Sequence, residues 1–242
     1  AFVLIIFFLN KNKRLSGHVA VGGILISLAL SIGVLGQMLV SHPEPENPFV
    51  HSVWGWIPVG DSWLQFGTLV DPLTAVMLLV VTLVGSCIFI YAQGYMSDDP
   101  RYARFFAFLS LFAMAMLILV LADNLVLLYI GWELVGLCSY LLIGFWFEKP
   151  AAANAAKKAF IVTRIGDVGL FLGLLVLYQN TGHADFIGMF EGVKQLAVSN
   201  PQLVTLAAIL LFCGAVGKSA QFPLHVWLPD AMEGPTPVSA LI

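Results

Sequence analysis

The stretch Leu203–Ala220 reads LVTLAAILLFCGAVGKSA, an apolar run with a single cation, Lys218, close to its end. Gly214, Gly217 and Pro223 surround that lysine. A charged residue at the centre of a membrane helix costs roughly 2.5–3.5 kcal/mol on insertion scales, so it usually faces a partner or a wet cavity. Glycine and proline on either side predict a helix that breaks where the charge lies.

The whole chain has the composition of a membrane protein. Of its 242 residues 60% are hydrophobic and 10% are charged, and the mean hydropathy is +0.92. About 20 apolar residues in a helix span a hydrocarbon core of about 30 Å. Apolar runs, the first too short to span, lie at residues 1–9, 17–40, 70–92, 104–122, 124–147, 159–178 and 203–221. The expected fold class is an all-α, polytopic transmembrane helix bundle with a broken seventh helix.

Both ends of the chain lie inside apolar runs. The chain has no initiator Met, and Val238–Ile242 follow Thr236 and Pro237 like the start of an eighth span. We therefore expect an N-terminal fragment of a longer protein. Its expected division is residues 1–68, with N-terminal spans and an outer hairpin, and residues 69–242, with a first helix repeat.

Basic residues in alternate loops predict the orientation, because Lys and Arg in short loops favour the cytoplasmic side. The long loop at residues 41–69 carries none of them, and the loop at residues 179–202 carries only Lys194. The other loops hold Lys11, Lys13, Arg14, Arg101, Arg104, Lys149, Lys157 and Lys158. These basic loops are expected to share the cytoplasmic side, with the N-terminus and the 41–69 loop outside.

The outer loop at residues 49–69 is too polar to cross the membrane but is rich in tryptophan. Trp54, Trp56 and Trp63 suit the membrane interface, and Val59-Gly60-Asp61-Ser62 suits the turn of a short β-hairpin. Asp71-Pro72 then predicts a cap and a first-turn proline for the next helix.

Once the loops and the first residues of each run are set aside, four charges remain inside the apolar runs: Glu133, Arg164, Asp167 and Lys218. Intramembrane charges commonly mark ion or proton paths, and opposite charges in contact favour each other's ionised form. Glu133 and Lys218 are therefore candidate partners in proton transfer. The alternative is a static ion pair that locks two helices.

Two further groups of residues are candidates for supporting roles. Arg164 and Asp167 are three residues apart and share a helix face, so they either pair only with each other or also contact Glu133. Asp167 is the better placed of the two to meet other polar groups. His225 follows the break and suits a proton relay, although capping or solvation of that histidine explains it equally well.

The sequence contains no glycine-rich phosphate loop, nucleophile elbow or histidine cluster, which argues against soluble enzyme chemistry on this chain. Cys87, Cys138 and Cys213 lie singly in apolar runs. We interpret them as packing residues rather than metal ligands or disulfide partners.

Four motifs carry a resemblance to a known family. They are GWELVGLCSYLLIGFW at residues 131–146, AAKKAFIVTRIGD at 155–167, GKSAQFPL at 217–224 and WLPDAMEGPTPVSALI at 227–242. In these the chain resembles the largest antiporter-like membrane subunit of respiratory complex I, the proton-pumping NADH:quinone oxidoreductase. The resemblance covers nearly everything after residue 69.

The resemblance assigns roles to the membrane charges. It implies that Glu133 and Lys218 are the proton-handling pair and that Arg164 and Asp167 modulate it. It also implies a histidine after Ile242, at the start of the eighth helix, and a second, inverted helix repeat beyond it. Residues 69–242 would then be the first antiporter-like repeat and would hold the entry half of one proton channel.

Partners and location follow from the same resemblance. No cofactor is expected on this chain, whereas FMN, iron–sulfur clusters and quinone are expected in partner subunits. The expected partners are the other membrane and peripheral subunits of complex I and the lipid bilayer, with no nucleic acid. The bacterial plasma membrane is the expected location, with the mitochondrial inner membrane as second choice. The alternative functions are the large subunit of a multisubunit Na⁺/H⁺ antiporter, a membrane-bound hydrogenase subunit and a purely structural bundle.

Overall fold

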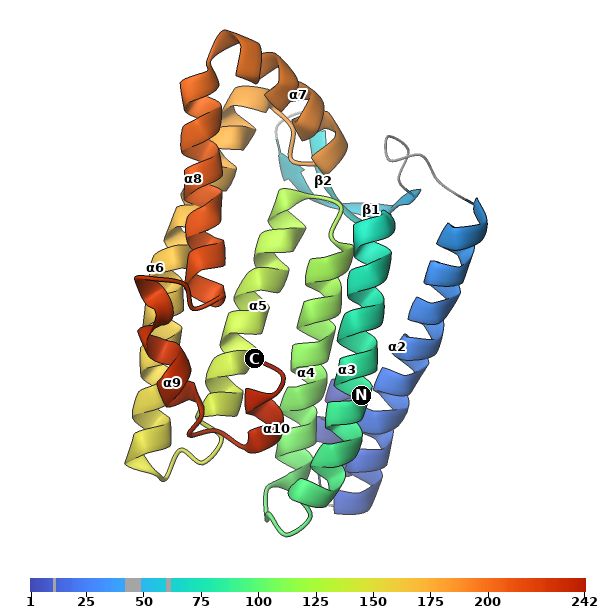
Figure 1. The fold of residues 1–242 in the computed structure, drawn as a ribbon. Helices are drawn as coiled ribbons and strands as arrows, with labels where there is room; N and C mark the ends of the chain where they lie inside the picture. Colours follow the sequence, from blue (N-terminus) through green and yellow to red (C-terminus); the bar gives the residue numbers. More distant parts are fainter. Residues whose placement is uncertain (11, 42–48, 60–61) are drawn as a thin grey trace.

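The computed structural model describes residues 1–10, 12–41, 49–59 and 62–242. Within them, six helices are long and apolar enough to cross a membrane, and they stand side by side as a bundle (Figure 1). These are α2 (Lys13–Ser41), α3 (Pro72–Tyr95), α4 (Tyr102–Leu121), α5 (Leu125–Ile143), α6 (Pro150–Thr181) and α8 (Pro201–Lys218). The predicted helix bundle is confirmed.

Most predicted helix ends are within a few residues of the observed ones, and α6 is the exception. It begins nine residues earlier than expected, because the alanine-rich segment 151–156 continues the helix after Pro150. The first apolar run forms two short pieces, α1 (Phe2–Leu4) and the π-helical η1 (Ile5–Leu9), packed against α4. The division of the chain at residues 68 and 69 stays a prediction.

The predicted hairpin forms an antiparallel pair, β1 (Phe49–Val59) with β2 (Ser62–Val70). The turn residues Gly60 and Asp61 lie outside the described residues, as does the side chain of Trp63. The Trp54 ring stacks on Phe66 at 5.5 Å between centroids, and its side chain is 59% exposed. This exposure agrees with a place at the membrane interface.

The predicted cap at the start of α3 is also confirmed. The Asp71 carboxylate accepts a hydrogen bond from the Thr74 backbone N–H at 2.6 Å, and Pro72 is the first helical residue. This arrangement satisfies one of the donors that every helix leaves free at its start.

One helix was not predicted from the sequence. Residues 186–199 were expected to be loop, but they form α7 (Phe186–Ser199), which packs against α6 and α8 at the hairpin end of the bundle (Figure 1). Gly182, in the left-handed region at φ 73°, ends α6. The Asp185 side chain then accepts from the Gly188 N–H at 2.7 Å and starts α7. The capping residue was visible in the sequence, but the helix is too short to span.

Backbone contacts tie the outer end of the bundle together. Leu125 N–H donates to the Ala184 carbonyl at 3.0 Å, and Phe186 N–H donates to the Asp123 carbonyl at 3.1 Å. Thr68 of the hairpin forms a β-bridge with Ala122. The hairpin, the α4–α5 turn and the α6–α7 turn are therefore linked through main-chain atoms.

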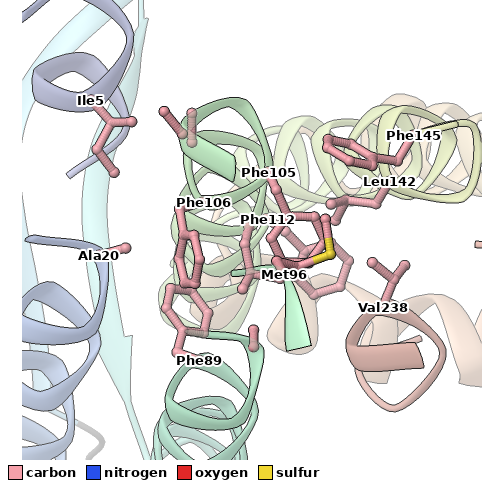
Figure 2. Packing of buried hydrophobic residues seen from close by; sticks show 14 of the residues in the cluster. Ile5, Ala20, Phe89, Met96, Phe105, Phe106, Phe112, Leu142, Phe145 and Val238 are labelled. Carbon is pink, nitrogen blue, oxygen red and sulfur yellow. The ribbon is translucent and has the colours of Figure 1, made fainter. Parts of the chain in front are cut away.

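The main hydrophobic core lies between α3, α4 and α5. Figure 2 shows Phe89, Met96, Phe105, Phe106, Phe112, Leu142 and Phe145 turned toward one another, with Val238 of the short helix α10 (Thr236–Ser239) beside them. Phe105 meets Phe106 and Phe145 edge to face, an arrangement that aromatic pairs favour. Close packing of this kind holds membrane helices together, because lipid is as apolar as the side chains.

The basic loops meet at the end of the bundle opposite the hairpin (Figure 1). Lys13 donates to the Asp99 carbonyl at 3.0 Å, and Arg101 pairs with Glu148 at 2.6 Å. The alternation of basic loops read from the sequence therefore corresponds to one end of the molecule. The assignment of that end to the cytoplasmic side stays a prediction.

We predict that Asp123, buried in the α4–α5 turn outside the spans, makes stability depend on pH. Burial is the main cause that raises the pKa of this carboxyl above its ordinary value. A raised folded-state pKa means that the contribution to stability is present below about pH 4, the unfolded value, and is lost as pH rises through the folded value. Asp123→Asn should flatten this dependence, measured as thermal midpoints of the purified protein between pH 4 and 7. The exposed Asp98→Asn is the control, and parallel curves for wild type and Asp123→Asn would contradict the prediction.

Candidate functional site

Three neighbouring helices carry the four membrane charges found in the sequence. Glu133 lies on α5, Arg164 and Asp167 lie on α6, and Lys218 is the last residue of α8. The Asp167 side chain is 1% exposed and that of Lys218 is 16% exposed. The structure brings all four side chains together. The two that lie nearest α8, Asp167 and Lys218, are largely enclosed.

Glycines allow α6 and α8 to pack in close contact. A Cβ atom added to Gly166 would lie 2.6 Å from the Cys213 carbonyl oxygen and 3.0 Å from the Gly217 Cα. Small residues at such positions let membrane helices approach backbone to backbone. The end of α8 is thereby held against the face of α6 that carries Asp167.

The four charges form a row of alternating sign. Arg164 Nη1 pairs with Glu133 Oε2 between α6 and α5. The same Arg164 nitrogen lies 3.8 Å from Asp167 Oδ2, and Lys218 Nζ lies 3.7 Å from that same oxygen. The order is Glu133, Arg164, Asp167, Lys218, so one carboxylate oxygen is shared between two cations. We call these four side chains the charge row.

Glu133 and Lys218, the candidate partners in proton transfer, do not pair directly with each other among the described residues, and their role stays a prediction. Among the described residues, the acid that pairs with Lys218 is Asp167, and the base that pairs with Glu133 is Arg164. The long guanidinium of Arg164 reaches across to α5. Asp167, three residues further along α6 by about 4.5 Å of helix rise, faces α8 instead. The expectation that Asp167 meets other polar groups, and that one of these two residues touches Glu133, is confirmed.

The predicted break after Lys218 is confirmed. Helix α8 ends at Lys218, and Ala220 takes the left-handed conformation with φ 48°. The chain continues in the 3₁₀-helix η2 (Leu224–Trp227) and α9 (Leu228–Ala231). The buried Trp227 donates its indole N–H to the Gly217 carbonyl at 3.0 Å. This bond satisfies a carbonyl in the last turn of α8 and fixes the position of the break.

His225 does not join the charge row. Its side chain is exposed, and its ring stacks on Phe222 at 5.9 Å between centroids. The nearby Asp230 instead pairs with Lys158 at 2.7 Å, which ties α9 to α6. In a 3₁₀-helix a residue two positions from the buried Trp227 lies on a different side, so His225 turns away as Trp227 turns inward.

Trp132 is a site residue that sequence reasoning missed. Its indole N–H donates to Asp167 Oδ1 at 2.5 Å, while Asp167 Oδ2 remains toward the two cations. The Lys218 ammonium lies 5.9 Å from the centre of the Trp132 ring, within the range of a cation–π contact. The available signal was an indole donor beside Glu133 in a membrane span, where such a donor needs a partner.

A cavity of about 260 Å³ opens beside the α8 end of the charge row. Most of its lining is apolar, and Lys218 and the hydroxyl-bearing side chains of Ser139, Tyr140, Thr163 and Ser219 contribute polar atoms. A cavity of this volume has room for several water molecules, and its polar atoms can form hydrogen bonds with them. Lys218 therefore lies between a carboxylate on one side and, on the other, a mostly apolar cavity to which a few hydroxyl groups contribute.

Gly136 makes room for the lysine. A Cβ atom on Gly136 would collide with Lys218 Nζ. Within the described residues, Lys218 Nζ, Asp167 Oδ2 and Glu133 Oε1 are buried and make no hydrogen bond. At 3.7 Å the Lys218–Asp167 contact is an ion pair too long to be a hydrogen bond. These groups are held near one another without being locked.

The described residues contain no group of three or more His, Cys, Asp or Glu side chains that could hold a metal ion. The chemistry that the charge row itself can perform is proton transfer. Its two carboxyl groups and its lysine can gain or lose a proton, whereas the arginine between the two acids stays positively charged.

Comparison with known families identifies the family of the chain. Residues 122–242 match the family model described as NADH:quinone oxidoreductase/Mrp antiporter, TM, and these residues are half of the chain. The chain belongs to the NADH:quinone oxidoreductase/Mrp antiporter family. Residues 56–106 also match the model described as NADH-Ubiquinone oxidoreductase (complex I), chain 5 N-terminus. The charge row and the helix break lie within the first match, and this member of the family is an integral membrane protein.

Several relatives of the family member are similar along most of its length. NAD(P)H-quinone oxidoreductase subunit 5, chloroplastic, of Anthoceros angustus is 52% identical over 98% of this chain, and that of Zygnema circumcarinatum is 52% identical over 96%. The same-named protein of Ranunculus macranthus is 50% identical over 98%. The chain spans 33% of the length of the first two relatives and 32% of the third.

Solved structures share the fold of this family member. A chain of the Mrp complex from Dietzia sp. is similar with a TM-score of 0.74 and 30% identity, covering 95% of this chain and 26% of the other. A chain of the membrane-bound sulfane sulfur reductase, an archaeal respiratory membrane complex, has a TM-score of 0.77 and 18% identity, covering 98% and 47%. The second similarity concerns the fold alone.

Proposed function

We propose that the chain is part of the proton-translocating membrane subunit of a complex I-type NAD(P)H:quinone oxidoreductase. The observation that carries this proposal is the charge row, which crosses three helices and ends at a helix break beside a cavity. Intramembrane ionisable groups that face one another mark proton paths. The similarity to proteins named NAD(P)H-quinone oxidoreductase subunit 5 supports the choice of complex.

The proposed transfer uses the sharing of Arg164 between two acids. When Arg164 lies with Glu133, the Asp167 carboxylate is left to Lys218 and favours its ammonium form. When Arg164 moves toward Asp167, Lys218 loses part of that attraction and can release its proton into the cavity. Because Asp167 Oδ2 is 3.8 Å from Arg164 and 3.7 Å from Lys218, a small side-chain movement exchanges the two states. His225, exposed on the far side of Trp227, is left without a role in this step.

Redox energy would come from other subunits of the complex. We propose that FMN, iron–sulfur clusters and quinone are held there, and that this chain itself carries none of them and performs no electron transfer. Neighbouring membrane and peripheral subunits are the proposed partners, and the lipid bilayer is the solvent. No role in nucleic-acid binding is proposed.

The second candidate is the large subunit of a multisubunit Na⁺/H⁺ antiporter. Similarity to a chain of the Mrp complex at 30% identity favours it, as does the family description, which names both groups. The 52% identity to quinone oxidoreductase subunits favours complex I more strongly.

The particular membrane is part of the proposal. The sequence-based expectation of a bacterial plasma membrane stays a prediction. The relatives described above are named as chloroplastic, which supports a photosynthetic energy-converting membrane as the competing location. Fractionation of source membranes with an antibody against the outer hairpin would decide between them.

Isolation of the full-length protein with its partners tests the proposed function. Complex I function predicts co-isolation with flavin- and cluster-bearing subunits, and proton uptake in proteoliposomes that depends on NAD(P)H and quinone. Co-isolation with membrane subunits alone, with Na⁺-dependent proton exchange and no quinone reduction, would establish the antiporter instead.

We predict that Trp132→Phe weakens coupled proton transfer in the intact complex. The change keeps an aromatic ring but removes the donor to Asp167, and a hydrogen bond to a charged group is worth about 1.5–3 kcal/mol. Proton translocation should fall several-fold and its pH profile should shift, because Asp167 loses the bond that orients it. Trp146→Phe is a matched control, since it removes an indole donor to Asp99 at the basic end. Identical pH profiles for the two variants would contradict the assignment of Trp132 as a positioning residue.

A further inference from the structure

A second cavity lies at the basic end of the bundle, away from the charge row. It has a volume of about 210 Å³ and is formed where α4 begins, α5 ends and α6 begins. Two cations, Arg104 and Lys157, line it together with the apolar side chains of Phe108, Leu141 and Phe145. The walls of the cavity are therefore mostly apolar, and its two charged side chains are both positive.

The cavity forms where small residues leave space beside large aromatic side chains. A Cβ atom on Gly144 would lie 3.0 Å from the Ala156 Cβ, so α5 and α6 meet closely at that point. Ala153, one turn earlier, lines the cavity with a side chain that leaves space. The exposed ring of Phe147 also lines the cavity. The result is a hollow rather than a flat surface.

The two cations of the cavity are not neutralised by ion pairs within the described residues. The Arg104 guanidinium lies over the rings of Phe108 and Phe147, at 5.2 and 5.6 Å from their centres, and Lys157 has no partner there. Two acids at this end of the bundle already pair with other cations. Glu148 pairs with Arg101 at 2.6 Å, and Asp230 pairs with Lys158 at 2.7 Å.

The Glu148 carboxylate also interacts electrostatically with Arg104. Its pKa is lowered chiefly by a backbone hydrogen bond and by the hydrogen bond from Arg101, and the Arg104 charge is a smaller cause. This exposed carboxylate is therefore committed to Arg101 and contributes only a distant counter-charge to the cavity.

Both cations lie near the start of a membrane-spanning helix, at the basic end of the bundle. Arg104 is the third residue of α4, and Lys157 is about 10 Å along α6 from its start by helix rise. Long basic side chains at such positions extend toward the membrane surface while their stems stay in apolar surroundings. Lipid phosphate groups lie at that surface, and arginine and lysine are the side chains that bind phosphate.

We propose that this cavity binds one anionic phospholipid. The lipid phosphate lies between Arg104 and Lys157, and the start of an acyl chain lies along Phe108 and Leu141. Charge complementarity selects the ligand, because a zwitterionic lipid would bring its own cation to a site that already holds two. Basic loops cluster at the same end of the bundle, and such clusters are attracted to a leaflet that contains anionic lipid.

The test uses the intact complex that contains the full-length protein, delipidated in neutral detergent. It is titrated with phosphatidylglycerol or phosphatidylcholine in nanodiscs, and bound lipid is counted by native mass spectrometry. Wild type should retain phosphatidylglycerol in preference to phosphatidylcholine. Arg104→Gln/Lys157→Gln should lose about tenfold or more of that affinity, as expected for two charge-assisted contacts. The control Arg14→Gln/Lys149→Gln makes the same change of charge at exposed basic positions outside the cavity and should retain it.

A second variant and a competitor keep the proposal falsifiable. Ala153→Leu fills the cavity but keeps both cations, and it should also lose the lipid, even if the double variant fails to assemble. Equal retention by wild type, the double variant and Ala153→Leu would overturn the proposal, as would equal affinity for the two lipids. Displacement by millimolar inorganic phosphate would reveal a free-anion site and overturn the lipid assignment. Absence of bound phosphatidylglycerol from the wild-type complex would also overturn the proposal.

Discussion

Replacing Lys218 by alanine in the intact complex is expected to abolish proton translocation. Lys218 lies between Asp167 and the 260 Å³ cavity, so its ammonium is the group that can pass a proton from the charge row into the cavity. A positioned acid or base accelerates proton transfer by about 10²–10⁴-fold, and the variant should fall below about a tenth of the wild-type rate. The measurement is proton uptake by proteoliposomes during NAD(P)H-dependent quinone reduction.

The matched control for this change is Lys194→Ala. Lys194 is an exposed lysine on α7 that belongs to no ion pair within the described residues, and its loss should leave translocation unchanged. The amount of assembled complex on native gels must be equal in both variants. Glu133→Gln, which neutralises the far end of the charge row, should also impair translocation strongly. Near-normal translocation by Lys218→Ala would leave the charge row as a structural ion-pair network.

The second large effect is expected for Asp167→Asn. This change keeps the size of the side chain and its acceptor for the Trp132 indole, but removes the negative charge shared by Arg164 and Lys218. Removing one partner of a buried ion pair costs about 3–5 kcal/mol, because the remaining charge is left uncompensated. Lys218 should then lose its proton more readily, and translocation should fall as far as in Lys218→Ala. The pH profile of any residual translocation should change.

Comparison with Glu133→Gln tests the order of the charge row. If Asp167 is the direct partner of Lys218, Asp167→Asn should disturb the pH profile more than Glu133→Gln does. The reverse ranking would mean that Glu133 contacts Lys218 directly in the working complex. Asp98→Asn, at an exposed carboxylate in the α3–α4 turn, controls for the loss of one negative charge.

The spans could be predicted from the sequence because a membrane imposes a minimum apolar length on each of them. The four charges could be found for the same reason, since the apolar context makes each one expensive. Helix α7 was missed because it is too short to span and lies in a segment broken by Gly182 and Asn200. Its caps at Asp185 and Asn200 were present, yet caps alone do not distinguish a helix from a turn.

The pairing inside the charge row could not be predicted from spacing alone. Residues three apart share a helix face, but spacing does not say that Arg164 reaches back to α5 while Asp167 faces α8. The hydrogen bonds of Trp132 and Trp227 could not be predicted for a related reason. Tryptophan in a membrane protein is typical of the interface, so a role as a hydrogen-bond donor inside the bundle has no separate pattern in the sequence.

The glycine contact between α6 and α8 limits how fast and by what motion the charge row can change state. The backbones of α6 and α8 meet at Gly166 and Gly217, so a shift of one helix along the other would disturb this contact. Rotation of the Arg164 and Lys218 side chains about their own bonds rearranges the charges and leaves the contact in place. Such rotations take picoseconds to nanoseconds when side chains are free to move, against microseconds or longer for shifts of whole helices. The rate of proton translocation would then depend on changes of charge near the charge row rather than on the side-chain rotations. The helix bundle itself would stay fixed and would keep the moving proton apart from the lipid.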